Sequence, residues 1–273
     1  MRVAAALAAL APRWRLLRSG AADGVTNMAI DAALLALARS TGTATLRLYG
    51  WAPRTLSLGR NERARDAFDP AALAARGVGL VRRPTGGRAL LHHREVTYSV
   101  TAPDALPLAA SYAAINALLL AALSRLGVDA RPATRAGRPL RPEGAACFAE
   151  PAAGELVVDG AKLVGSAQLR EAGALLQHGS ILIADDQPLI AELRRSRAAQ
   201  GATASRDRDA RTARAATLEH VLGRSVTPLE VEDAMAAALA DAVPTEPFDA
   251  ALLRPGLARL VIAFADPEWT WRR

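Results

Sequence analysis

The sequence predicts an α+β fold in which helices pack on a mixed, largely antiparallel sheet. Short β-like runs are joined by tight turns, which is typical of antiparallel hairpins. Longer segments with a 3.6-residue apolar period lie between these runs, without the strict alternation of a doubly wound fold. Beyond residue 187 the patterns are helical, so we expect a helical C-terminal segment.

The first half of the chain reads as five strands and three helices. Residues 106–127 have the apolar period of a long buried helix, in which Leu118, Leu119 and Leu123 recur. A turn at 51–53 separates two of the strands. The expected strands are 14–19, 44–49, 55–58, 78–83 and 95–101, and the expected helices are 27–39, 69–76 and 106–127.

The second half begins with a loop at 131–143, which is rich in Pro, Arg and Gly. Tight turns at 159–160 and 171–173 connect the strands that follow, and Thr227 with Pro228 is typical of a helix start. The expected strands are 155–158, 161–166 and 175–183, and the expected helices are 189–197, 215–222 and 228–242.

We expect the chain to be divided into three parts. Residues 1–13 are short and weakly hydrophobic, so we expect a frayed extension and not a secretory leader. Residues 14–187 form the core domain. Residues 188–273 form a helical C-terminal segment packed on that core.

The composition excludes several classes of protein. The chain of 273 residues is 51% apolar and 22% charged, as in ordinary globular proteins. No run of 18 apolar residues occurs, so we expect no transmembrane helix and no membrane partner. The net charge of +7 is scattered, and acidic residues interrupt the densest basic stretch at 194–214. We therefore expect no nucleic-acid binding, although docking of an acidic carrier protein fits this charge.

Two residue types occur once each. Cys147 is the sole cysteine, which excludes an intramolecular disulfide and a cysteine-rich metal site and fits a reducing cytoplasm. Lys162 is the sole lysine among 34 lysines and arginines. A lysine serves where a compact charge that can release a proton is needed, which arginine cannot supply. Taken alone, each residue also has a plainer interpretation: Cys147 as a small buried apolar residue, and Lys162 as a lysine retained by chance.

Three stretches combine glycine with polar side chains. In 82–93 a strand runs into Gly86 and Gly87, which would let the backbone approach a ligand, although a plain hairpin is the alternative. A Gly-Ser-Ala segment follows Lys162. His178 interrupts an apolar strand, where a polar group is costly unless it is satisfied or used.

These stretches resemble, in order, the motifs of the octanoyltransferase branch of the lipoate–protein ligase and biotin–protein ligase superfamily. The resemblance runs from about residue 14 to 183 and implies a mixed α/β catalytic domain whose sheet cradles a lipoyl or octanoyl chain. The matching motifs are NMAID (27–31), LRLYGW (46–51), TLSLG (55–59), RRPTGGRALLHH (82–93), ELVVDGAKLVGSAQ (155–168) and LLQHGSILI (175–183).

The resemblance also implies the site. Cys147, in the sequence Ala-Cys-Phe before the lysine strand, would be the nucleophile, and Lys162 the essential lysine. A cation beside a thiol lowers the thiol pKa by about one unit per 1.4 kcal/mol, so this pair could supply a thiolate near neutral pH. No metal is implied. The acyl-binding residues would be Arg83, Thr85, Gly86, Gly87, Arg88, His92, Gly165, Ser166, Ala167 and His178.

The position of Cys147 favours a transferase over a ligase. The implied reaction is ping-pong: Cys147 takes octanoate from the phosphopantetheine of octanoyl acyl carrier protein and passes it to a lysine of a lipoyl domain, such as the glycine-cleavage H protein. It needs no cofactor and no ATP. We expect a cytoplasmic monomer. The alternatives are an ATP-dependent lipoate–protein ligase, an amidotransferase between lipoyl domains, a biotin ligase and a non-enzymatic acyl-binding module.

Overall fold

A computed structural model describes residues 3–133, 148, 154–195 and 215–272. Cys147, most of the predicted loop at 131–143 and most of the basic stretch at 194–214 therefore lie outside the described residues. The strands of the main sheet are β1 (Trp14–Ala22), β2 (Ala44–Trp51), β6 (Glu95–Pro103), β7 (Arg131–Pro132), β8 (Leu156–Val158), β9 (Ala161–Glu171), β10 (Ala174–Leu182) and β11 (Thr245–Glu246).

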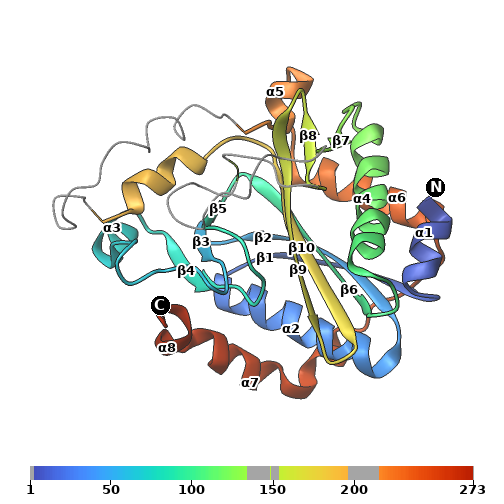
Figure 1. Cartoon of the computed structure of the whole chain (residues 1–273), viewed down its shortest axis with the longest axis horizontal. Coiled ribbons are helices and arrows are strands. Elements are labelled where there is room, and N and C mark those ends of the chain that lie inside the picture. Colours follow the sequence, from blue (N-terminus) through green and yellow to red (C-terminus); the bar gives the residue numbers. More distant parts are fainter. Residues whose placement is uncertain (1–2, 134–147, 149–153, 196–214, 273) are drawn as a thin grey trace.

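The main sheet has the strand order β11-β1-β2-β6-β10-β9-β8-β7 (Figure 1). Among these described strands, β1 pairs in parallel with both β11 and β2, and every other pairing is antiparallel. The prediction of a mixed, largely antiparallel sheet is confirmed. The strands expected from the sequence are present, and four of them, β1, β2, β6 and β9, extend a few residues further than their patterns indicated.

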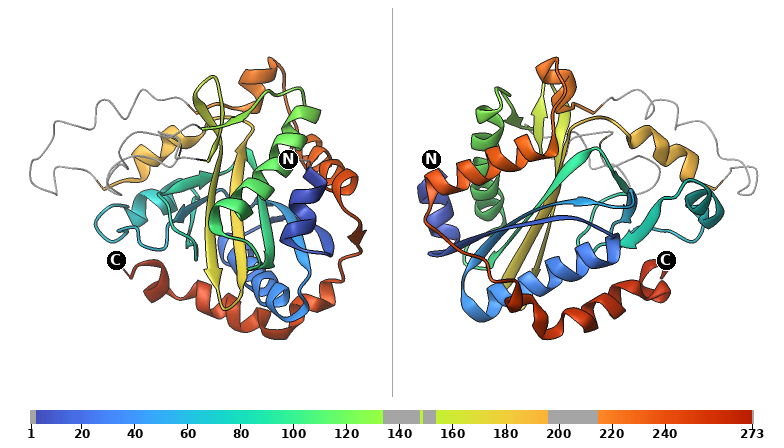
Figure 2. Two further views of the ribbon diagram at one scale, coloured as in Figure 1. Left: turned by 45° about the vertical axis from the view of Figure 1, so that its right-hand side comes forward. Right: turned by 180° about the vertical axis from the view of Figure 1, so that it is seen from behind.

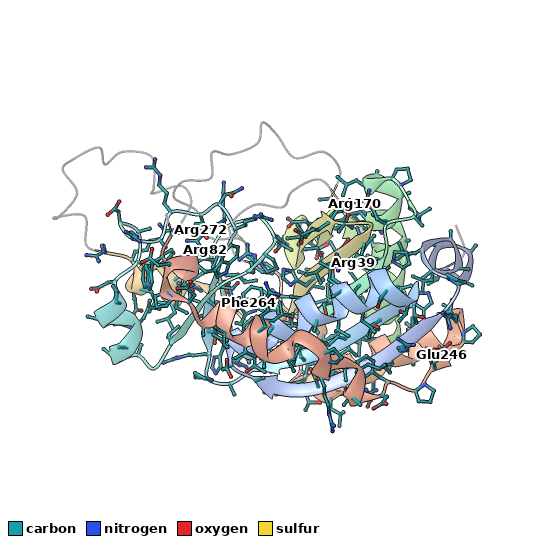
Figure 3. All side chains as sticks on the ribbon, turned by 90° about the horizontal axis from the view of Figure 1, so that it is seen from below. Arg39, Arg82, Arg170, Glu246, Phe264 and Arg272 are labelled. Carbon is teal, nitrogen blue, oxygen red and sulfur yellow. The ribbon has the colours of Figure 1, made fainter. Side chains whose placement is uncertain are left out.

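Helices cover both faces of this sheet. Figure 2 shows α1, α4 and α6 gathered on one face, while α2 and α7 lie on the other. Figure 3 shows α7 running beside α2 when that face is seen from below. These helices are α1 (Val3–Leu10), α2 (Gly24–Thr41), α4 (Leu108–Arg125), α6 (Pro228–Ala242) and α7 (Arg254–Ala265).

A second, three-stranded sheet, which the sequence did not predict as a separate unit, has the order β4-β3-β5. Leu56, Phe68 and Leu91 are central members of its own buried apolar cluster. The elements of this unit are β3 (Thr55–Leu58), α3 (Pro70–Ala75), β4 (Gly79–Arg82), β5 (Leu90–His92) and the 3₁₀ helix η1 (Gln187–Leu193).

The expectation of a frayed N-terminal extension was wrong. Residues Val3–Leu10 form α1, whose Ala6, Leu7 and Leu10 are buried against α4 and α6. The indole of Trp14 donates to the carbonyls of Leu7 and Ala11 at 3.2 Å. The run looked weakly hydrophobic because its side chains are small, yet these small side chains allow the close packing of the helix on the core.

The C-terminal segment contains both predicted and unpredicted helices. The helix expected at 228–242 is α6, which begins with a capping box formed by Thr227 and Glu230. The pattern at 215–222 corresponds to α5 (Leu218–Leu222), and the one at 189–197 to the 3₁₀ helix η1. The sequence did not predict α7 and α8 (Pro267–Thr270), in which the indole of Trp269 donates to the carbonyl of Arg82 at 2.9 Å.

Within the described chain, α4 is long and apolar enough to cross a membrane by length and composition alone. Polar residues such as Ser111 and Asn116 interrupt its apolar run. Ile115, Leu118 and Leu119 are fully buried in the main core of this structure, together with apolar side chains of α1 and α6.

Candidate active site

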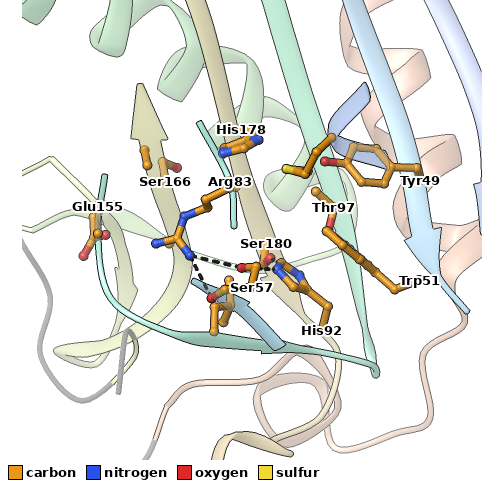
Figure 4. A pocket seen from close by; sticks show the side chains of 16 residues that line it. Tyr49, Trp51, Ser57, Arg83, His92, Thr97, Glu155, Ser166, His178 and Ser180 are labelled. Atoms are coloured by element: carbon orange, nitrogen blue, oxygen red, sulfur yellow. Dashed lines mark hydrogen bonds between the residues drawn. The ribbon is translucent and has the colours of Figure 1, made fainter. Parts of the chain in front are cut away.

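An open cavity lies between the two sheets and α2 (Figure 4). Seven of the sequence-predicted acyl-binding residues line it. The lining residues are Met28, Tyr49, Trp51, Ser57, Arg83, Gly87, Leu90, His92, Thr97, Glu155, Gly165, Ser166, Ala167, His178, Gly179 and Ser180.

Thr85, Gly86 and Arg88 do not line the cavity, although all three belong to the turn that borders it. The guanidinium of Arg83 donates to the carbonyls of Gly86 at 2.9 Å and Arg88 at 2.8 Å. It also donates to the hydroxyl of Ser57 at 3.0 Å. Arg83 thus fixes the shape of this turn from the inside, and its contact with an acyl substrate stays a prediction.

A close backbone approach at this turn is made by Gly59 against Gly87, whereas the approach of Gly86 and Gly87 to a ligand stays a prediction. A Cβ placed on Gly59 would lie 1.9 Å from the carbonyl oxygen of Gly87, so only glycine fits there. Gly87 itself has a φ of 97°, a conformation that side chains disfavour. The turn at 83–88 is therefore pressed against the end of β3, which determines where it borders the cavity.

His178 is both satisfied and placed in the cavity wall. Its Nδ1 lies 3.1 Å from the carboxylate of Asp31, and its Nε2 lies 2.7 Å from the hydroxyl of Thr85. Arg47 donates to the same carboxylate at 2.8 Å. Burial alone would raise the pKa of Asp31, but Arg47 and His178 outweigh it and hold that pKa below its ordinary value. The imidazole is thus fixed between a carboxylate and the glycine turn.

His92 is held in a second buried chain of polar groups. Its ring stacks on Trp51 with 3.9 Å between centroids, and its two nitrogens lie 2.8 Å from Glu95 Oε1 and from Ser57 Oγ. Burial lowers the pKa of His92, while the nearby Glu95 partly offsets this. The neutral ring can then donate to Glu95 through Nδ1 and accept from Ser57 through Nε2. Trp51 donates to Thr97 at 2.7 Å, which completes this wall.

Lys162 forms an ion pair with Glu155. Its ammonium lies 2.7 Å from Glu155 Oε1, and the two side chains are 2% and 9% exposed. It also lies 4.8 Å from the ring centroid of Phe148. A Cβ on Gly165 would come within 2.8 Å of Lys162 Cε, so the lysine is packed against this glycine. Glu155 and Gly165 line the cavity, and Lys162 lies directly behind them.

The expected pairing of Lys162 with Cys147 stays a prediction, because Cys147 lies outside the described residues. No group of three or more His, Cys, Asp or Glu residues within the described ranges could hold a metal ion. The roles assigned to the ten acyl-binding residues are likewise predictions, now with seven of them placed around one cavity.

Sequence reasoning missed several residues of this site. Asp31, Arg47, Trp51, Ser57 and Glu155 all lie within or at the ends of the matched motifs, but no role was assigned to them. The sequence contains a signal for Arg47, because this residue interrupts an apolar strand as His178 does. A buried charge of this kind requires a partner.

Comparisons with known proteins agree with this geometry. The sequence matches the lipoyl protein ligase A/B catalytic domain over residues 23–240. It is 43% identical over 276 residues to octanoyltransferase LipM of Kyrpidia tusciae, covering 95% of this chain and 99% of that protein. It is 42% identical over 238 residues to octanoyltransferase LipM of Symbiobacterium thermophilum, with 84% and 86% covered.

A solved structure of the bi-partite lipoate protein ligase of Thermoplasma acidophilum with its E2 lipoyl domain has the same fold, with a TM-score of 0.73 at 21% identity. It covers 95% of this chain and 96% of that one. The chain thus belongs to the lipoyl protein ligase A/B catalytic domain family. It is an acyltransferase of lipoate biosynthesis, and the group that it transfers is octanoyl.

Proposed function

We propose that the octanoyl group passes through a thioester on Cys147. The donor is octanoyl acyl carrier protein, and the acceptor is a lysine of a lipoyl-domain protein such as the glycine-cleavage H protein. One observation carries this proposal: Phe148, which follows the sole cysteine in the sequence, packs on the ammonium of Lys162 beside the acyl cavity. The residue directly after the predicted nucleophile thus contacts the buried lysine.

The proposed reaction has two balanced steps. The Cys147 thiol gives up its proton, its thiolate attacks the carbonyl carbon of the donor thioester, and the phosphopantetheine thiolate leaves and takes up that proton. The neutral amine of the acceptor lysine then attacks octanoyl-Cys147, the thiolate of Cys147 leaves, and the amine proton returns to it. The donor thioester becomes a thioester on Cys147 and then an amide on the acceptor, so the proposed reaction needs neither ATP nor a cofactor.

The fold family supports a lipoyl domain as acceptor. The T. acidophilum ligase of the same fold is described with its E2 lipoyl domain. A donor on a carrier protein fits a chain with a net charge of +7, because acyl carrier proteins are acidic and opposite charge raises the rate of encounter.

Intact mass spectrometry tests this proposal directly. The protein is mixed with octanoyl acyl carrier protein in the absence of ATP. We expect a gain of one octanoyl group that hydroxylamine removes and that Cys147→Ala does not acquire. Labelling of Cys147→Ala, or labelling that requires ATP, contradicts the thioester route and favours an ATP-dependent ligase. A protein that accepts octanoate only from an octanoylated lipoyl domain would be an amidotransferase.

A further inference from the structure

The ion pair between Lys162 and Glu155 is built into the hairpin of β8 and β9. Val157 pairs with Lys162 across this hairpin, and the register shifts by one residue between Leu156 and Val157. Alternate residues of an extended chain point to the same side, so Glu155 lies on the side of Val157 and Lys162. The shift corresponds to a β-bulge, which re-aims side chains. On this shared side, Glu155 Oε1 lies 2.7 Å from Lys162 Nζ.

The backbone around Glu155 is anchored without help from Lys162. The carbonyl of Glu155 accepts from the N–H of Ala133 at 2.7 Å, and the carbonyl of Gly154 accepts from the side chain of Asn116 at 2.6 Å. The first contact comes from the residue that directly follows β7, and the second comes from α4. The backbone position of Glu155 is therefore set by the fold.

Several ionisable groups face this pair. Burial, together with the charge of Glu155, raises the pKa of Tyr112 on α4 to about 12. Burial also raises the pKa of Tyr98 on β6, so both hydroxyls are neutral at pH 7. Arg83 and His178 line the same cavity as Glu155. Burial of the Lys162 ammonium is costly, and the negative charge of Glu155 compensates it.

The pair as a whole is neutral, which changes what Lys162 can contribute. A lone buried cation would activate a thiol through its net charge. In the ion pair, Glu155 accepts from the ammonium and fixes its place, from which the positive charge can stabilise a thiolate or the oxyanion of a tetrahedral intermediate. Precise placement then matters more than net charge.

We propose that Glu155 is a positioning residue of octanoyl transfer: its carboxylate holds the Lys162 ammonium against Gly165, at the wall of the acyl cavity. This inference rests on the proposed thioester function. It predicts that the charge of Glu155, more than its volume, is needed for acylation, and that its effect acts through Lys162.

Single-turnover octanoylation, followed by intact mass over a range of donor concentrations, tests this. We expect Glu155→Gln, which keeps the shape and loses the charge, to lower the maximal rate by about 30- to 100-fold. The half-saturating donor concentration should change little. Glu155→Asp, which keeps the charge, should lose less. Asp159→Asn removes the same charge from the exposed turn of the hairpin and is the matched control, with an expected change within about twofold.

A double-mutant cycle separates positioning from a merely structural role. In a Lys162→Gln background, Glu155→Gln should lower the remaining rate by no more than about twofold. An equal loss in both backgrounds, or a Glu155→Asp variant slower than Glu155→Gln, overturns the inference. If Glu155→Gln does not fold, the same cycle with Glu155→Asp decides it. Wild-type protein that gains no octanoyl group contradicts the thioester function itself, whereas labelled wild type with an unaffected Glu155→Gln contradicts only the inference.

Discussion

The two ends of the cavity are held together by different interactions. At the aromatic end, Trp51 stacks on His92 and their polar atoms are hydrogen-bonded to buried groups. At the charged end, Lys162 and Glu155 are held together by opposite charge behind Gly165. In the view of Figure 4, Glu155 and Trp51 lie on opposite sides of the cavity with Arg83 between them. The difference shows that the aromatic end is held by stacking and hydrogen bonds, while the charged end depends on an ion pair.

The largest expected effect concerns the buried carboxylate that supports the cavity wall. Asp31→Asn leaves the fully buried guanidinium of Arg47 without its counter-charge and weakens the contact to His178. Breaking such a pair typically costs about 3–5 kcal/mol in the free energy of unfolding. Urea denaturation measures this loss.

Asp233→Asn is the control for this change. Asp233 accepts from Arg18 at 2.6 Å, but both side chains are well exposed. Surface pairs of this kind contribute about 1 kcal/mol or less. If Asp31→Asn and Asp233→Asn lower the free energy of unfolding equally, the buried pair of Asp31 and Arg47 does not stabilise the cavity wall near His178.

The next prediction asks whether the charged end needs a lysine or only a positive charge. Lys162→Arg keeps the charge, but the guanidinium is larger, and Lys162 Cε already lies within 2.8 Å of the place of a Cβ on Gly165. We expect octanoylation to slow by at least about 100-fold, which corresponds to about 2.7 kcal/mol in the barrier. Single-turnover mass measurements check this.

The reverse exchange farther along β9, Arg170→Lys, provides the comparison. Arg170 pairs with Asp104 away from the cavity, so the rate should change by about twofold at most. A near-normal rate for Lys162→Arg would show that charge alone is sufficient, and the contrast between the two ends would then be smaller than the geometry indicates.

The smallest effect is a pH dependence of stability at the aromatic end. Burial lowers the pKa of His92 in the folded protein, whereas in the unfolded chain a histidine has a pKa of about 6.5. As pH falls below about 6.5, the unfolded state takes up a proton that the folded state does not, so stability is lost down to the folded pKa. His92→Gln should therefore lose less stability than wild type between pH 7.5 and about 5.5.

Unfolding at several pH values measures this difference. His93→Gln is the control, because the side chain of His93 is 45% exposed and lies against Asp186 at the surface. A His92→Gln variant whose stability falls with pH as steeply as that of wild type would show that the aromatic end does not keep its imidazole neutral.

The sequence predicted those parts of the fold that depend on local patterns. The 3.6-residue period located α2 and α4, and Thr227 with Pro228 located the start of α6. The sequence pattern did not predict α1, because this alanine-rich helix is stabilised by packing on helices that are distant in the sequence. It also missed the second sheet, because the parallel pairing of β3 with β4 is set across α3 and not by neighbouring residues.

The candidate site was predictable to a similar degree. The resemblance to the family's motifs implied ten acyl-binding residues, and seven of them lie in the cavity wall. The partners of these residues could not be read from the chain. Asp31 meets His178 only because α2 packs on the main sheet, and Glu155 meets Lys162 only when β8 and β9 pair in their observed register.

The sequence separation of the contacts at the two ends has a consequence for folding kinetics. Glu155 and Lys162 are seven residues apart, so their contact can form as soon as the β8–β9 hairpin closes. Asp31 and His178 are separated by 147 residues and meet only when the chain is nearly native. Contacts of high sequence separation form slowly, because a long loop must be closed first. The Glu155–Lys162 pair can thus assemble early, while the cavity wall around His178 is completed among the last steps of folding.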